Sequence, residues 1–180
     1  MRVLLDTSQS VEDADTYVYN PYAPDTPEQR AGRRSSPTMT AVGLLMRLHT
    51  GYARDDPRFV GAATKLAAEL PSNGSRGRPT RDCYLWYYVS QVLFHVGGEA
   101  WDRWYGRLYE ILVASQETVG DRAGSWNPGG EVPDRWGAFG GRIYVTALNL
   151  LTLEVTYRHL PIDQAVVRPA DDRETGRSSP

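Results

Sequence analysis

The sequence predicts an all-α fold, a curved two-layer array of antiparallel helical hairpins with about five main helices. Three observations lead to this prediction. The segment Arg81–Val96, RDCYLWYYVSQVLFHV, is charged only at its first two positions and places apolar groups on every face, so other helices must cover it on nearly all sides. Segments of this kind alternate along the chain with segments that have one polar face. A short motif also recurs in the apolar segments.

Composition favours a single soluble domain. The 180 residues are enough to bury a sizeable core but few for two domains, and 41% of them are hydrophobic, as in globular proteins. The net charge of -2 leaves no basic footprint for nucleic acid or for an anionic membrane surface. One cysteine excludes an intrachain disulfide, and no segment has the roughly 18 apolar residues that a membrane span needs. The N-terminal apolar run is too short for a signal peptide. We therefore expect a soluble, cytoplasmic protein.

The helical domain is predicted to span residues 37–162, between two segments of different character. Residues 1–36 show no sustained periodicity and contain several prolines. We expect them to form an irregular N-terminal arm, with a short strand-like piece at Thr16–Tyr19. Residues 163–180 are polar and contain prolines, so a disordered tail is predicted there.

Capping residues mark where the predicted helices begin. Ser36 and Asp56 precede Pro37 and Pro57, which is the arrangement of an N-cap followed by proline in the first helical position. Thr80 is the expected cap of the next helix. The predicted helices are Pro37–Thr50, Pro57–Leu70, Arg81–Val96, Glu99–Gln116 and Arg142–Arg158. The first, third and last of these are apolar on most faces and should form an inner layer, whereas the other two have a polar face for solvent.

The three inner helices share a short motif. The segments Thr40-Ala-Val-Gly-Leu-Leu45, Ser90-Gln-Val-Leu-Phe94 and Thr146-Ala-Leu-Asn-Leu-Leu151 begin 50 and 56 residues apart. Spacings of this size are typical of helical-hairpin repeats. A glycine-rich loop, Glu117–Gly141, connects the last two helices and carries Trp126 and Trp136. Loops of this length in compact domains are usually functional or are packed by their own side chains.

Two motifs in the second half of the domain carry a resemblance to a known superfamily. Glu110–Gln116 followed by Gly124-Ser125-Trp126 resembles the QW repeat of squalene cyclases, in which an outer helix ends in Gln and the indole of a Gly-x-Trp lies near it. Arg78–Tyr87 is similar to the zinc-bearing inner helix of protein prenyltransferases, where Asp-x-Cys-Tyr leads into aromatic residues. The resemblance implies the α/α toroid of terpenoid cyclases and prenyltransferases. With fewer hairpins than a closed ring, this chain would form a toroid-like arc.

The zinc ligands of prenyltransferases are not preserved. The resemblance places Cys83 at the thiolate ligand, but the aspartate position falls on Arg81 and the histidine position falls on Val145. A catalytic zinc needs three protein ligands and an open position, so we expect no metal and no other cofactor. The interpretation that remains for Cys83 is a small buried hydrophobe. Asp55 and Asp56 are no better as a magnesium site, because a helix cap explains Asp56.

The general acid of squalene cyclases is also missing. It is the middle aspartate of Asp-x-Asp-Asp-Thr, and the nearest string, Glu12-Asp-Ala-Asp-Thr16, has Ala14 at that position. The sequence holds no P-loop, dinucleotide fingerprint or Ser-His-Asp set. His49, His95 and His159 lie at or near predicted helix ends, where imidazolium favours the free carbonyls, so we interpret them as structural. The sequence therefore predicts no catalytic residues.

The candidate ligand-binding residues are side chains of the inner surface and its rim. The resemblance implies that Tyr84 and Tyr87 line an isoprenoid site and that Arg78 is a contact for diphosphate. The complete candidate set is Arg78, Cys83, Tyr84, Tyr87, Tyr88, Gln91, Arg142 and Tyr144. An open arc also exposes inner-helix surface at its ends, which favours pairing with a partner protein or with another copy of the chain.

Two hypotheses on function follow. The first is a non-catalytic, squalene cyclase/prenyltransferase-like helical-repeat module that binds an apolar ligand, such as an isoprenoid, or a partner protein on its aromatic inner surface. The alternative is an isoprenoid-processing enzyme of the terpene cyclase or prenyltransferase type. Carboxylates at the bottom of an inner cavity would favour the enzyme, and an apolar wall without them would favour binding.

Overall fold

The computed structural model describes residues 2–10, 13 and 15–158, and it is all-α, as the sequence predicts. The main helices are α2 (Pro37–His49), α3 (Pro57–Ala67), α4 (Cys83–Val96), α5 (Gly98–Ser115) and α6 (Gly137–Leu153). The short elements are α1 (Arg2–Thr7), α7 (Val155–Arg158), two 3-10 turns at Arg30–Arg33 and Gly120–Arg122, and the antiparallel strands β1 (Gly74–Ser75) and β2 (Arg78–Pro79). Within the described residues, no helix combines the length and the apolarity that crossing a membrane requires.

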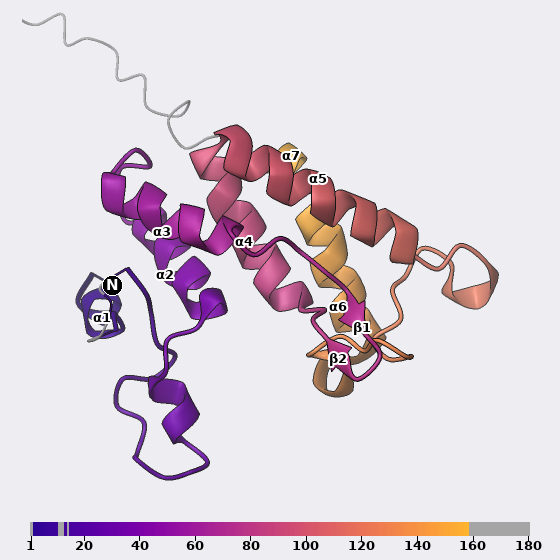
Figure 1. Ribbon diagram of the computed structural model, residues 1–180, viewed down its shortest axis with the longest axis horizontal. Coiled ribbons are helices and arrows are strands. Elements are labelled where there is room, and N and C mark those ends of the chain that lie inside the picture. Colours follow the sequence, from indigo (N-terminus) through magenta and orange to yellow (C-terminus); the bar gives the residue numbers. More distant parts are fainter. Residues whose placement is uncertain (1, 11–12, 14, 159–180) are drawn as a thin grey trace, which may run out of the picture.

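Helix α4 lies at the centre of the arrangement (Figure 1). It packs against α2 on one side and α6 on the other, and it also contacts α3 and α5. Helix α3 covers α2 and α4, while α5 covers α4 and α3. The helices predicted to be apolar on most faces, α2, α4 and α6, therefore form one layer, and α3 and α5 form the second. This position explains why α4 has almost no charged residues.

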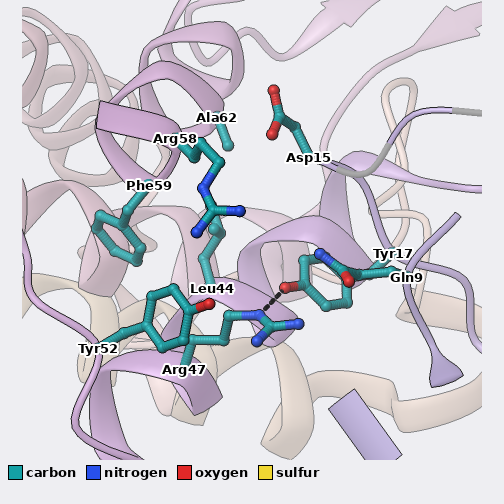
Figure 2. A pocket seen from close by; sticks show the side chains of 9 residues that line it. All are labelled: Gln9, Asp15, Tyr17, Leu44, Arg47, Tyr52, Arg58, Phe59 and Ala62. Atoms are coloured by element: carbon teal, nitrogen blue, oxygen red, sulfur yellow. Dashed lines mark hydrogen bonds between the residues drawn. The ribbon is translucent and has the colours of Figure 1, made fainter. Parts of the chain in front are cut away.

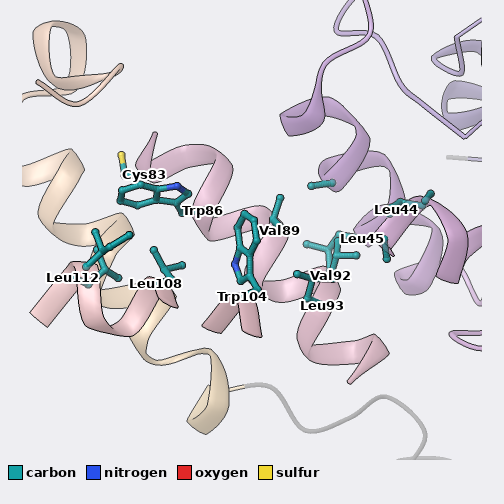
Figure 3. Close-up of a cluster of buried hydrophobic side chains, with 14 of the residues drawn as sticks. Leu44, Leu45, Cys83, Trp86, Val89, Val92, Leu93, Trp104, Leu108 and Leu112 are labelled. Carbon is teal, nitrogen blue, oxygen red and sulfur yellow. The ribbon is translucent and has the colours of Figure 1, made fainter. Parts of the chain in front are cut away.

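The core runs along α4 (Figure 3). Its fully buried side chains meet Leu44 and Leu45 from α2 and Trp104 from α5. The Trp104 indole Nε1 donates a hydrogen bond to Ser90 Oγ at 3.0 Å, so the polar atom of this buried ring has a partner. The buried residues of α4 include Cys83, Trp86, Val89, Val92 and Leu93. Burying each large apolar side chain contributes about 1.5–3 kcal/mol.

The caps of α2 and α3 are those that the sequence predicts, and the cap of α4 is different. The side chains of Ser36 and Asp56 accept hydrogen bonds from backbone N–H groups in the first turns of α2 and α3. The predicted cap Thr80 instead donates its hydroxyl to the Ser72 carbonyl at 2.8 Å, because it closes the β1–β2 hairpin. Asp82 caps α4, and that helix begins two residues later than expected.

The last inner helix is interrupted near both ends. Gly141 has a φ of 65°, a left-handed conformation that glycine adopts easily, and it kinks α6 just before Arg142, the predicted first residue. The helix then stops at Leu153, and α7 continues to Arg158. The predicted segment Arg142–Arg158 is therefore helical on both sides of a break at Glu154.

The N-terminal arm packs against α2 through buried side chains. Tyr17 and Val18 are 2% and 5% exposed. Both form isolated bridges, with Gln9 and Ser35 respectively, where a strand-like piece is predicted. The Tyr17 ring lies directly over Gly43, where an added Cβ would come within 2.5 Å of ring atoms. The arm also contains α1, which the sequence does not predict. The predicted tail, residues 163–180, lies outside the described residues.

Candidate functional site

Three tyrosines of α4 and the tryptophan before α6 form a continuous aromatic surface, which we call the aromatic wall. The ring centres of Tyr84 and Tyr88 are 4.8 Å apart, and those of Tyr87 and Tyr88 are 5.0 Å apart, both with edge-to-face geometry. Tyr84 also lies 5.6 Å from Trp136. Such pairs stabilise one another by about 0.5–1.5 kcal/mol beyond their burial. All four rings are half-buried, so the wall is ordered and still presents apolar area to solvent.

Tyr144 and Gln91 lie beside the wall with different roles. Tyr144, from α6, packs against the core, and its ring lies over Gly140, where an added Cβ would come within 2.5 Å of it. Burial raises the pKa of Tyr144, with smaller contributions from Cys83 and Tyr88. Gln91 is only 4% exposed, and its amide donates to the backbone carbonyl one turn earlier at 3.5 Å. Of these two predicted residues, Tyr144 can extend a binding surface and Gln91 is part of the packing.

Burial also shifts the acidity of the wall itself. The pKa of Tyr88 is raised to about 12, first because the ring is desolvated and then because Tyr84 hydrogen-bonds to it. The hydroxyl therefore stays protonated at physiological pH, and the wall carries no negative charge from this tyrosine.

A buried thiol–carboxylate pair lies at the N-terminal end of the wall. Cys83 is fully buried, and its Sγ donates to Asp134 Oδ1 at 3.4 Å. The same carboxylate accepts from the Cys83 backbone N–H at 3.0 Å and from the Trp136 backbone N–H at 2.9 Å. Asp134 thus joins the start of α4 to the loop before α6. Burial, followed by the neighbouring Asp134 charge, raises the pKa of the Cys83 thiol, which disfavours the thiolate that zinc binding or nucleophilic attack requires.

Asp82 makes a second connection between the same two segments. Its Oδ1 accepts from the Leu85 backbone N–H at 2.9 Å and from the Trp136 indole Nε1 at 3.0 Å. Arg135 lies 3.6 Å from its Oδ2, but the arginine side chain is 71% exposed, so this ion pair is weak. Burial raises the pKa of Asp82. Within the described residues, no group of three or more His, Cys, Asp or Glu side chains is placed to hold a metal ion.

An open groove of about 760 Å³ lies where β2 leads into α4 and the loop before α6 crosses it. Its lining residues include Arg81 and Asp82 from the start of α4 and Pro128 and Asp134 from the loop before α6. Arg81 is 9% exposed and donates Nη1 to the Val132 carbonyl at 3.4 Å. The rings of the aromatic wall do not line this groove, so groove and wall are separate surfaces.

The two arginines of the predicted site lie away from the wall. Arg78 is an exposed residue of β2. Arg142 donates Nη1 to Glu117 Oε1 at 3.0 Å and to Ser125 Oγ at 2.9 Å, so it is held by the loop that follows α5. The structure therefore brings together the aromatic members of the predicted set and Cys83, but neither arginine joins them.

The motif that resembles a QW repeat connects α5 to α6. Trp126 is fully buried, and its indole Nε1 donates to the Leu112 carbonyl at 2.8 Å. Its backbone N–H donates to Thr146 Oγ1 at 3.2 Å. Gln116 forms a bridge with Trp126 and donates its amide to the Gly124 carbonyl at 3.0 Å. These residues hold the loop in place and have a structural role.

A small cleft between the arm, α2 and α3 contains a buried arginine that the sequence did not suggest as a site (Figure 2). Arg47 is 7% exposed; its Nε donates to the Tyr17 hydroxyl, and its Nη2 donates to Asp6 Oδ1 at 2.9 Å. Its guanidinium carbon lies 5.0 Å from the Tyr52 ring centre. Cation–π contacts and an ion pair thus stabilise the Arg47 charge. Its contacts with Tyr17 and Asp6 hold the arm against α2.

Sequence reasoning missed Asp134 and the contribution of Trp136 to the wall. The long glycine-rich loop with its tryptophans indicated that this segment is packed or functional. No local pattern indicates that Asp134 in this loop contacts Cys83. Comparison with protein-family models, with curated proteins and with solved structures gave no match.

Proposed function

We propose that the chain is a non-catalytic helical-repeat module that binds an apolar ligand or a partner protein on its aromatic wall. The observation that carries the proposal is the wall itself, a continuous set of rings that is ordered by mutual contacts and partly exposed. Tyrosine and tryptophan supply large apolar area at low conformational cost and are enriched at the centres of binding interfaces.

The polar groups beside the wall support binding more than catalysis. Asp134 already accepts three hydrogen bonds, and burial keeps the Cys83 thiol protonated. A general acid or a metal ligand needs a free position toward the substrate or the ion. The similarity of Arg78–Tyr87 to prenyltransferases supports an isoprenoid as one class of apolar ligand. The alternative, an isoprenoid-processing enzyme, is one possible outcome of the binding experiment described next.

The test compares farnesol binding and co-purification between wild type and a wall variant. Tyr84→Ser combined with Tyr87→Ser removes two rings from a partly exposed helix face and should leave the fold intact. We expect native purification to retain an apolar ligand or a protein on wild type, or farnesol to quench its tryptophan fluorescence. The variant should bind at least about tenfold more weakly, since each buried ring contributes about 1.4 kcal/mol or more.

Tyr109→Ser is the matched control, because Tyr109 is 52% exposed on α5 and is not part of the wall. It should bind as wild type does. The proposal fails if wild type binds neither farnesol nor a co-purifying molecule, or if the wall variant binds as tightly as the control. Turnover of squalene or farnesyl diphosphate by wild type would instead establish the enzyme alternative.

A further inference from the structure

The outward side of α6 is an apolar surface that no other described element covers. Ile143 and Leu150 are 86% and 42% exposed, and Ala147 between them is also exposed. Spacings of four and three residues place these side chains on one side of a helix. Phe139, also exposed, lies before the break at Gly141, and its ring centre is 6.4 Å from that of Trp136, so it is not counted in this surface. We call Ile143, Ala147 and Leu150 the α6 face.

The α6 face lies opposite the side by which α6 joins the core. Val145, Asn149 and Thr152 are at most 1% exposed, and the helix packs against α4. Helix α4, in contrast, has an inner-layer neighbour on each side, α2 and α6. The α6 face therefore points to the position where one more helix of the inner layer would lie.

The sequence motif of the inner helices supports this placement. When the helices are aligned on that motif, Ala41, Gln91 and Ala147 occupy the same position. Ala41 and Gln91 are 0% and 4% exposed, whereas Ala147 is exposed. A position that is buried in α2 and α4 is thus open in α6. A terminal unit of a helical array normally carries a polar outer side, and α6 does not.

The opposite end of the inner layer is closed by the chain's own arm. Tyr17 lies over Gly43 of α2 and is 2% exposed, and Arg47 fastens it. If copies of the chain associated head to tail, the α6 end of one copy would pack on the α2 end of the next, so both ends would have to be open. If the α6 face pairs with the α6 face of a second copy, only the α6 end has to be open, and the pair closes as a twofold dimer.

The low charge of α6 is also compatible with a second copy of the chain as the partner. Arg142 is the only charged residue between Gly137 and Leu153, and it is held by Glu117 at 3.0 Å and by Ser125. Two α6 faces can therefore meet without repulsion between like charges. Exposed apolar area of this kind is also what an interface core requires.

We propose that the α6 face binds the α6 face of a second copy of this chain across a twofold axis. The part of α6 after the kink at Gly141, residues 142–153, is about 18 Å long, so the contact is smaller than a standard interface of about 1,600 Å², and the dimer should dissociate on dilution. The inference goes beyond the proposed function, because the α6 face and the aromatic wall share no residue and the mass of the protein tests dimerisation without reference to ligand binding.

Light scattering after size-exclusion chromatography tests the proposal over loading concentrations from about 1 μM to about 200 μM. The mass of wild type should rise from the 20.1 kDa of one chain toward twice that value. Ile143→Glu should stay at the mass of one chain throughout, because dimerisation would bury two unpaired carboxylates. Its far-UV circular dichroism should match wild type, since Ile143 is exposed in the monomer.

Val119→Glu is the matched control, another exposed aliphatic side chain, 81% accessible, that lies outside the α6 face. It should dimerise with the concentration dependence of wild type. Two results would overturn the proposal. One is a wild-type mass that stays at 20.1 kDa at the highest concentration. The other is an Ile143→Glu variant that dimerises as wild type does.

Discussion

Asp82 shows how one side chain can serve two segments that are far apart in the sequence. It caps α4 through the Leu85 N–H and accepts from the Trp136 indole at 3.0 Å, 54 residues away. The side chain is 7% exposed, and this burial raises the pKa of Asp82. The hydrogen bonds favour the charged form and desolvation opposes it, and desolvation is the larger effect.

The raised pKa of Asp82 has a definite consequence for stability. A carboxyl group whose folded-state pKa exceeds its unfolded value binds its proton more tightly when folded. Its contribution to stability is therefore fully present below the unfolded pKa and is lost as the pH rises through the folded pKa. Asp82→Asn keeps an oxygen acceptor for both hydrogen bonds and removes the charge. We expect the free energy of unfolding of this variant not to fall as the pH rises through the folded-state pKa of Asp82. The variant should be at least as stable as wild type at neutral pH.

Urea unfolding at a series of pH values from about 4 to 7 measures this effect. Asp121→Asn is the control, since Asp121 is an exposed residue of the turn Gly120–Arg122, and it should retain the wild-type pH profile. If Asp82→Asn keeps the wild-type fall in stability, or is clearly less stable than Asp121→Asn at neutral pH, the interpretation of Asp82 is wrong.

The local sequence of Cys83 indicates its burial, but only the tertiary structure shows its hydrogen-bond partner. The interpretation of a small buried hydrophobe agrees with its complete burial. The carboxylate that accepts its thiol hydrogen, Asp134, lies 51 residues away and could not be assigned from the motif. Cys83 and Asp134 form a hydrogen-bonded pair that holds α4 to the loop before α6.

Among the larger elements, the arm and α2 depend on each other most directly. The Tyr17 ring needs the space that Gly43 leaves, and Thr40 Oγ1 accepts from the Tyr17 backbone N–H at 3.3 Å. Glycine is a poor helix former, so its presence inside α2 costs about 0.5–1 kcal/mol relative to alanine. Packing of the arm offsets this cost.

Gly43→Ala should therefore destabilise the protein, although alanine favours the helix. The new Cβ would lie 2.5 Å from the buried Tyr17 ring, which cannot move without displacing the arm. We expect a loss of about 1–3 kcal/mol in the free energy of unfolding. Limited proteolysis should also cut the arm faster than in wild type, because the displaced segment is accessible.

The same substitution in the neighbouring helix is the control. Gly61 lies in α3, and no heavy atom lies within 4 Å of an added Cβ there. Gly61→Ala should raise the free energy of unfolding by about 0.5–1 kcal/mol through helix propensity alone. Equal effects of the two substitutions would contradict the role given to the Tyr17–Gly43 contact.

The protein as a whole has one continuous core to which all the main helices contribute. Helices α2 to α6 all place residues in it, and Leu93 of α4 is fully buried. Because the layers share this core, unfolding should be cooperative. Far-UV circular dichroism and tryptophan fluorescence should then report the same transition.

Leu93→Ala tests the central position of α4. We expect it to lower the free energy of unfolding by about 2–5 kcal/mol while the two spectroscopic transitions still coincide. Val113→Ala, at a residue of α5 that is 49% exposed, should change stability by less than about 0.5 kcal/mol. Separate transitions for the two probes would show that the layers unfold independently and would contradict a single core.

Most of the helical layout could be predicted, whereas the candidate site could be predicted only in part. Ser36 and Asp56 mark helix starts because a cap acts within one turn. The tyrosines of the wall were predicted because they lie within a single helix. Asp134 and the burial of Gln91 depend on how α4, α6 and the intervening loop pack, and no short pattern records that packing.

The sequence by itself determined the five main helices and which of them are apolar on most faces, because periodicity and capping act over a few residues. Only the tertiary structure decided that Tyr17 closes one end of the inner layer, 30 residues from its partner Arg47, and that none of the described elements covers the α6 face at the other end. The physical reason is that an apolar helix face must be covered by something, but its own sequence does not specify which segment arrives.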